Sequence, residues 1–292
     1  MKLLSHLSPN GDGLLPLPAD ARLLQLGRTA WDEALAAAAD PGAAEQARSW
    51  SADGPGKSLL DAILSNSAFL AGIAIAEWAF LSRLVEEGAG PLFDVIIATT
   101  ESRAEQGENR AALMRRLRIA RRRVALLAAV AELAGSWSLE QQMAALSRFA
   151  EAAIGAAVRR VLRDAAANGA ISLPDPDDPE AGSGFIVLAV GKLGGGELNY
   201  SSDIDLILLY ELSDGTGVDE DRAQSLFARM ARDAARILDE RTGDGYVFRT
   251  DLRLRPDPRS TPLAISVAAA RSPATGRALI KAARSQFWPT VS

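Results

Sequence analysis

The chain of 292 residues has no cysteine, and aromatic residues make up only 5% of it. Without cysteine the protein can form neither disulfides nor thiolate metal sites, which is typical of the cytosol. Long apolar runs are also missing: the longest, Ala68 to Leu81, is too short to cross a membrane and includes Glu77. The N-terminal segment is interrupted by His6, Ser8 and Pro9, so it does not read as a signal peptide. We therefore expect a soluble, cytoplasmic protein without a membrane partner.

An excess of positive charge is absent as well, because 32 Lys and Arg residues are outnumbered by 37 Asp and Glu residues. The net charge of −5 and the pI of about 5.2 argue against nucleic acid as a partner. Apolar residues account for 48% of the chain, which indicates a folded protein. Alanine dominates this fraction, so we expect a high helix content in one large or two ordinary domains.

Helical periodicity dominates the first 170 residues. Residues 19–39 predict a helix, whereas the Pro-, Gly-, Asp- and Ser-rich stretch 40–56 predicts a loop. Residues 92–103 are compatible with either helix or strand, because the apolar run there is too short for its periodicity to decide. The buried positions expected in the first helix are Leu23, Leu24, Leu26 and Trp31. Further helices are predicted at 58–66, 68–87, 110–135 and 139–167, the last begun by a capping box at Ser138.

The predicted helix at 110–135 is unusually basic. One interpretation is a solvated face that alternates with Leu117, Val124 and Leu127; the other is a contact surface for an acidic partner or for the following domain. A phosphate-backbone site is disfavoured, because no aromatic residues interleave. The arginines concerned are Arg115, Arg116, Arg118, Arg121, Arg122 and Arg123.

The most informative stretch lies at residues 185–210, after a Pro-, Gly- and Asp-rich linker at 168–184. An apolar run at 185–190 predicts a buried strand, and a glycine-rich turn follows at 191–196. Glycines let backbone N–H groups approach a phosphate closely, and Lys192 can add a positive charge. A second apolar run at 204–210 predicts the next strand.

Two carboxylates stand where this second strand begins. Because side chains alternate along a strand, Asp203 and Asp205 point the same way, about 7 Å apart at their Cα atoms. Such neighbours repel each other unless a cation lies between them, and one or two Mg²⁺ ions would make a site for phosphoryl or nucleotidyl transfer. A glycine turn or a DxD pair alone is weak evidence, but the two in succession favour the metal–nucleotide interpretation over a plain β-turn-β.

Residues 219–240 predict an amphipathic helix and 242–245 a turn, before a strand at 246–255. That strand alternates, with charged residues at its odd positions. One interpretation is an edge strand with a solvated side. The other is that Asp251 completes a carboxylate triad with Asp203 and Asp205, while Arg253 and Arg255 meet phosphate oxygens.

The string GKLGGGELNYSSDIDLI at 191–207 carries a Gly-Lys, Gly-Glu, Ser-Asp-x-Asp pattern that resembles the nucleotidyltransferase superfamily. Its fuller wording is similar to the bifunctional glutamine synthetase adenylyltransferase/adenylyl-removing enzymes. ELNYSSDIDLI resembles their first, adenylyl-removing half; the second half typically reads REMTxxSDLDLI. YVFRTDLRLRP at 246–256 and the helical stretches from residue 59 onward resemble the same family.

The resemblance implies an α+β fold, with a helical bundle at 1–170 and a nucleotidyltransferase domain at 171–265 that has a small mixed sheet and flanking helices. It implies AMP removal from a tyrosine of glutamine synthetase by phosphate, releasing ADP, with ADP or ATP as the nucleotide and a nitrogen-signalling protein as a further partner. Two Mg²⁺ ions would be held by Asp203, Asp205 and Asp251. The nucleotide and its phosphates would be held by Gly191, Lys192, Ser202, Arg253 and Arg255.

The resemblance stops near residue 266. The family usually continues with an aromatic-rich helix and a WERxAxxKAR-like segment, which the tail 266–292 lacks, as it lacks the regulatory helices and the second catalytic domain. We therefore expect a shortened chain. Two alternatives stay open: ATP-dependent adenylylation of glutamine synthetase, or an inactive module that binds glutamine synthetase or a nitrogen-signalling protein.

Overall fold

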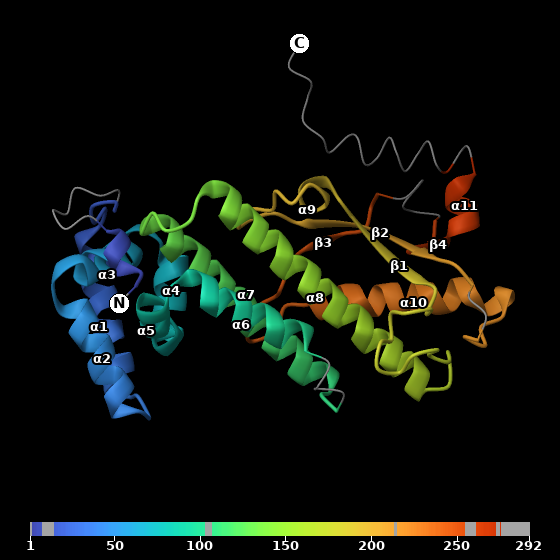
Figure 1. Ribbon diagram of the computed structural model, residues 1–292, viewed down its shortest axis with the longest axis horizontal. Coiled ribbons are helices and arrows are strands. Elements are labelled where there is room, and N and C mark those ends of the chain that lie inside the picture. The colour runs from blue at the N-terminus through green and yellow to red at the C-terminus, as the bar shows by residue number, and fades with distance from the viewer. Residues whose placement is uncertain are drawn as a thin grey trace, which may run out of the picture. The chain divides into compact units, whose positions relative to one another are not determined.

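The computed structural model describes residues 2–7, 15–102, 107–212, 215–254, 261–272 and 275 (Figure 1). It has the predicted α+β fold, with a small mixed sheet and flanking helices. Contacts divide the chain into one unit of residues 1–99 and 119–146 and a second of residues 100–118 and 147–292. The chain passes between the two units at residues 99/100, 118/119 and 146/147, each time inside a helix, and the domain boundary near residue 170 stays a prediction. We call the two units the helical unit and the sheet unit.

The sheet unit is organised around one central strand. Strand β2 (Ile204–Tyr210) pairs antiparallel with β1 (Phe185–Val190) on one side. On its other side it pairs in parallel with β3 (Thr250–Asp251) near its start and with β4 (Ala264–Ser266) near its end. The predicted bounds of β1 and β2 are confirmed. Because β2 is flanked on both sides, the residues at its start are held by β1 on one side and β3 on the other.

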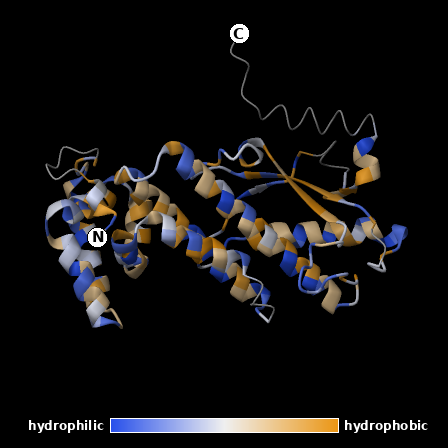
Figure 2. Ribbon diagram, in the orientation of Figure 1, coloured by the Kyte–Doolittle hydropathy of each residue, from blue (hydrophilic) through white to orange (hydrophobic). Residues whose placement is uncertain are grey.

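The two faces of this sheet pack against different partners, and Figure 2 shows how hydrophobic β1 and β2 are. On one face Leu206 and Leu208 meet α8 (Leu139–Ala167), from Ile154 onward, and α10 (Glu220–Asp239), which Figure 1 shows running along the sheet. The other face holds a cluster of Ile207, Leu209, Leu254 and Ile265, against which Val267 and Ala270 of α11 (Val267–Arg271) pack. The first residues of the predicted tail 266–292 therefore belong to the sheet unit.

A buried arginine connects helix α7 (Arg110–Leu133) to the turn that precedes β3. Arg118 is fully buried, and its guanidinium donates to the carbonyl oxygens of Met114, Ile237, Glu240 and Gly245. Burial lowers the pKa of Arg118, while nearby acidic residues of α10 and the turn raise it. Three of the accepting carbonyls lie at the end of α10 or in the following turn, where a cation offsets the helix dipole. A solvated basic face is therefore the wrong description of this part of α7.

The predicted strand at 246–255 is much shorter in the structure. Residues 242 and 245 form the predicted turn through an isolated bridge, but only Thr250 and Asp251 pair with β2. Outside the ladder the predicted alternation is lost: Tyr246 is exposed, Val247 and Phe248 are both buried, and the N–H groups of these two donate to the Leu238 carbonyl oxygen of α10 instead of to a strand. Side-chain alternation alone therefore overstated the length of this strand.

The helical unit consists of short helices whose starts are set by side-chain caps. Asp20 accepts the N–H groups of Arg22 and Leu23, and Asp40 accepts those of Gly42 and Ala43. The loop predicted at 40–56 is therefore wrong: Asp40 begins a helix with Pro41 in its first turn, where proline fits. The elements here are a 3₁₀ turn (Leu4–His6), α1 (Ala21–Ala36), α2 (Pro41–Ala52), α3 (Gly54–Asn66), α4 (Ala68–Ala76), α5 (Trp78–Glu87) and α6 (Ala89–Glu101), with the later part of α7 and the start of α8.

The stretch 68–87, predicted as one helix, is two helices bent by 89° at Glu77. The Glu77 carboxylate at this bend is buried and accepts hydrogen bonds from Arg122 and Arg123 of α7. Within the described residues no single helix is long and apolar enough to span a membrane, although α4 and α5 together meet that criterion by composition.

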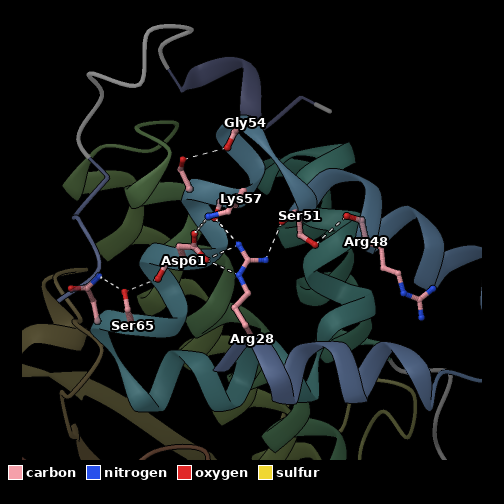
Figure 3. Close-up of polar contacts among 9 residues, drawn as sticks. Arg28, Arg48, Ser51, Gly54, Lys57, Asp61 and Ser65 are labelled. Atoms are coloured by element: carbon pink, nitrogen blue, oxygen red, sulfur yellow. Dashed lines mark hydrogen bonds and ion pairs between the residues drawn. The ribbon is translucent and has the colours of Figure 1, made fainter. Parts of the chain in front are cut away.

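An ion cluster around the buried carboxylate of Asp61 joins α1, α2 and α3. The Asp61 carboxylate, only 9% exposed, accepts from Arg28 Nε at 2.7 Å and from Lys57 Nζ at 2.6 Å (Figure 3). Arg28 also donates to the carbonyl oxygen of Ser51 at the end of α2. The carboxylate therefore has a charged partner on each oxygen, which offsets the cost of burying it.

The apolar face of α1 is rotated relative to the prediction. Trp31 is buried and packs edge-on against Trp50 of α2, as expected for a core residue. Leu23 and Leu26 are exposed instead, and Leu24 is half-buried. Gly27 is buried, and α1 and α3 approach each other closely there. A Cβ at this position would lie 2.9 Å from the Cβ of Leu64. Of residues 92–103, left open by their sequence, the structure describes 92–102, and these are helical as far as Glu101 in α6.

Candidate active site

The glycine-rich segment follows β1 directly. Gly191 has φ = 61° and Gly196 has φ = 71°, a backbone region that L side chains rarely adopt. A Cβ on Gly194 would lie 2.7 Å from the carbonyl oxygen of Ala189, so the short helix α9 (Gly191–Gly194) packs closely against β1. Leu193 is buried and Lys192 is exposed. The turn is thus anchored by one leucine and leaves the lysine side chain in solvent.

The loop between α9 and β2 is closed by local hydrogen bonds. Leu198 is fully buried, and its N–H donates to the Ser147 hydroxyl of α8. The Ser202 hydroxyl donates to Asn199 Oδ1 at 2.8 Å and accepts the Asn199 N–H. Ser202, predicted at the nucleotide site, therefore shapes the loop that delivers Asp203 to the start of β2.

Sheet register brings two of the predicted carboxylates together. Asp205 of β2 and Asp251 of β3 are directly paired positions on parallel strands, so their side chains leave the same face of the sheet. Asp205 is also the register partner of Val190, the last residue of β1 before the glycine turn. Asp203 lies two residues before Asp205 in the chain. The start of β2 thus gathers the carboxylates beside the glycine turn.

Two of these carboxylates are engaged by arginines. Asp203 Oδ1 accepts from Arg249 Nε at 2.5 Å, and Arg249 Nη2 also donates to the Ser201 carbonyl oxygen. Asp251 accepts from the backbone N–H and the guanidinium of Arg253, at 2.8 Å and down to 2.5 Å. The Asp251 side chain is 11% exposed, whereas the Arg253 side chain is largely in solvent.

The pKa of Arg253 is influenced by all three carboxylates, those of Asp203, Asp205 and Asp251. Its pKa is raised, first by the hydrogen bond to Asp251 and then by the charge of Asp251, with smaller contributions from Asp203 and Asp205. All three carboxylates therefore act on one guanidinium. This agrees with the register, which puts them at the same end of the sheet.

The donor set suits a hard divalent cation, because carboxylate oxygens are preferred by Mg²⁺. In the structure, the guanidiniums of Arg249 and Arg253 supply the positive charge beside Asp203 and Asp251. As the side chains lie, however, no group of three His, Asp or Glu residues within the described part of the chain could hold a metal ion. The residue types and register fit Mg²⁺, and in the observed rotamers Arg249 and Arg253 contact two of the carboxylates.

The remaining predicted residues differ in how far the structure describes them. Gly191, Lys192 and Ser202 surround the start of β2, and Arg253 contacts Asp251. Arg255 lies outside the described residues. The sequence did not single out Arg249, the partner of Asp203. Its signal was nevertheless present, because Arg249, Asp251 and Arg253 occupy alternate positions of the predicted strand, which would put them on one face.

The chain matches the family model of glutamate-ammonia ligase adenylyltransferase (GlnE) over residues 57–273. It is similar to bifunctional glutamine synthetase adenylyltransferase/adenylyl-removing enzymes from several bacteria. The protein from Rhizobium meliloti is 45% identical over 224 residues, 75% of this chain and 23% of the relative. That from Bartonella quintana is 43% identical over 223 residues (75% and 22%), and that from Mesorhizobium japonicum is 40% identical over 259 residues (88% and 26%).

The chain therefore spans about a quarter of the length of the curated relatives it matches. The matched region contains the glycine turn, β2 and β3, together with most of the helices before them. Because the family model covers well over half of the sequence, the chain belongs to the glutamate-ammonia ligase adenylyltransferase family.

Proposed function

We propose that the start of β2 is a Mg²⁺-dependent nucleotidyltransferase site that removes AMP from an adenylylated tyrosine of glutamine synthetase, releasing ADP. The observation that carries the proposal is the register pair Asp205 and Asp251, next to the turn at Gly191. The direction rests on ELNYSSDIDLI at 197–207, which resembles the adenylyl-removing half of the family. The relatives are named for both directions and for glutamine synthetase.

In this reaction an oxygen of inorganic phosphate attacks the phosphorus of the tyrosyl-AMP ester. The bond between that phosphorus and the tyrosine oxygen breaks, the tyrosine oxygen takes up a proton, and ADP leaves. Bound Mg²⁺ would neutralise charge on the reacting phosphoryl oxygens. Because phosphate is already ionised at neutral pH, no strong general base is needed from the chain.

The residues of this chain would divide the remaining tasks between them. Asp203, Asp205 and Asp251 hold the metal, while backbone N–H groups of the turn and Lys192 receive nucleotide phosphate. Arg253, whose side chain is 82% exposed beside Asp251, can reach a phosphate oxygen without uncovering the core. Positioning and charge neutralisation account for most catalysis in phosphoryl transfer, so this division needs no covalent intermediate.

The test measures nucleotides formed by the full chain from adenylylated glutamine synthetase, with Mg²⁺. Phosphate-dependent ADP release is expected. AMP transfer from ATP onto unmodified glutamine synthetase, without ADP release from the modified enzyme, would assign the opposite direction. If neither reaction occurs and the chain still binds glutamine synthetase or a nitrogen-signalling protein, the chain is a binding module and the proposal is wrong.

A further inference from the structure

Arg249 has a fixed backbone and a movable side chain. The carbonyl oxygen of Arg249 accepts the N–H of Ile204 at 2.9 Å, which holds its main chain beside the start of β2. The Arg249 side chain is 60% exposed, and its contacts in the described structure are the Asp203 carboxylate and the Ser201 carbonyl oxygen. The guanidinium can therefore leave Asp203 without disturbing the strand.

A guanidinium on Asp203 and a metal ion on Asp203 exclude each other. Arg249 donates directly to Oδ1, the kind of oxygen that a divalent cation would coordinate, and like charges at that distance repel strongly. A metal ion entering the site must displace the guanidinium. Once displaced, the guanidinium stays tethered next to the site, where a phosphate of a bound nucleotide would give it a new anionic partner.

We propose that Arg249 is an exchangeable counter-ion: it neutralises Asp203 before metal binds and contacts nucleotide phosphate afterwards. This inference rests on the proposed function, because it needs both a metal and a nucleotide at this site. It assigns to Arg249 two opposite effects, competition with the metal and attraction of the nucleotide. An ion pair with a purely structural role would not show both effects together.

The experiment titrates the full chain with Mn²⁺ alone and follows bound Mn²⁺ by electron paramagnetic resonance; ADP affinity is then measured at saturating Mn²⁺. Arg249→Gln removes the charge and keeps a hydrogen-bonding side chain. It should bind Mn²⁺ about twofold to fivefold more tightly, the worth of an exposed ion pair. It should bind ADP roughly tenfold more weakly, as expected when a charge-assisted hydrogen bond is lost.

Arg229→Gln is the matched control, because it removes the same charge from an exposed position of α10. It should change neither affinity. If wild type binds Mn²⁺ and Arg249→Gln binds it no more tightly, or if ADP affinity is unchanged, the exchange is refuted while the metal site stands. If neither wild type nor Arg249→Gln binds Mn²⁺, although both unfold cooperatively at the same temperature, the proposed metal site itself fails.

Discussion

At the scale of single residues, the partners in the Asp61 cluster differ in exposure, and we expect them to contribute unequally to stability. Asp61 is buried and serves two cations, whereas the Lys57 side chain is half exposed. Asp61→Ala should lower the free energy of unfolding by about 3 kcal/mol, because Arg28 keeps its position with an uncompensated charge. Lys57→Gln should cost less than about 1 kcal/mol. Urea denaturation of the two variants measures both, and equal losses would contradict the cluster's geometry.

Tyr210 makes a pH-dependent contribution to stability. The ring stacks on Phe227 of α10 at 4.8 Å, and burial raises the pKa of Tyr210, with a smaller contribution from Glu220. Because the folded pKa lies above the unfolded one, the stabilisation is complete below pH 10 and is lost as pH rises through the folded pKa.

Tyr210→Phe should therefore lose less thermal stability than wild type between pH 9 and about pH 11. Melting temperatures followed by circular dichroism across this range measure the difference. Tyr246→Phe, at an exposed position, is the control and should follow wild type. A parallel decline of Tyr210→Phe and wild type would mean that the phenol of Tyr210 does not contribute.

At the scale of elements, the glycine turn depends on one close approach. A Cβ at Gly194 would meet the backbone of Ala189, whereas a Cβ at Gly195 has nothing nearer than 3.6 Å. Gly194→Ala should therefore displace α9 from β1, lower ADP affinity and reduce stability by about 1–3 kcal/mol. Gly195→Ala should change neither the ADP affinity nor the stability measurably. Calorimetric titration with ADP and Mg²⁺ compares them, and equal tolerance of both alanines would contradict the packing.

Elements with a complete local signal were predictable. The capping box is confirmed, since Ser138 accepts the N–H of Gln141 and Gln141 accepts the N–H of Ser138, and α8 spans the predicted 139–167. Strands β1 and β2 also matched, because each is an apolar run bounded by turn residues. Helix α2 was missed because its Pro and Gly were interpreted as loop residues, although Asp40 and Pro41 form a helix start.

Features set by tertiary contacts were not predictable from local pattern. Glu77, at the bend, contacts two arginines about 45 residues away, and the burial of Arg118 depends on carbonyl groups more than 100 residues away. The short β3 follows from the same cause. The N–H groups of Val247 and Phe248 donate to Leu238 of α10, so these two residues do not extend the ladder. For the candidate site, the sequence indicated which residues approach each other, but not that arginines contact two of the carboxylates.

At the scale of the whole molecule, family membership and the candidate site lie in the same part of the chain. The matched region runs from α3 to the residues just after α11, and it includes the four strands that the structure describes. The chain spans about a quarter of its relatives' length, and the site proposed at the start of β2 lies within this matched part. We propose that the carboxylates at the start of β2 carry out AMP removal.

The measurement that tests this claim most directly is phosphate-dependent ADP release from adenylylated glutamine synthetase by wild type, Asp205→Asn and Asp221→Asn. Asp221, in the first turn of α10, is a charge-matched control away from the paired strands. We predict release by wild type and Asp221→Asn, and a loss of at least about a hundredfold in Asp205→Asn. Release that is undiminished in a folded Asp205→Asn variant would contradict the account.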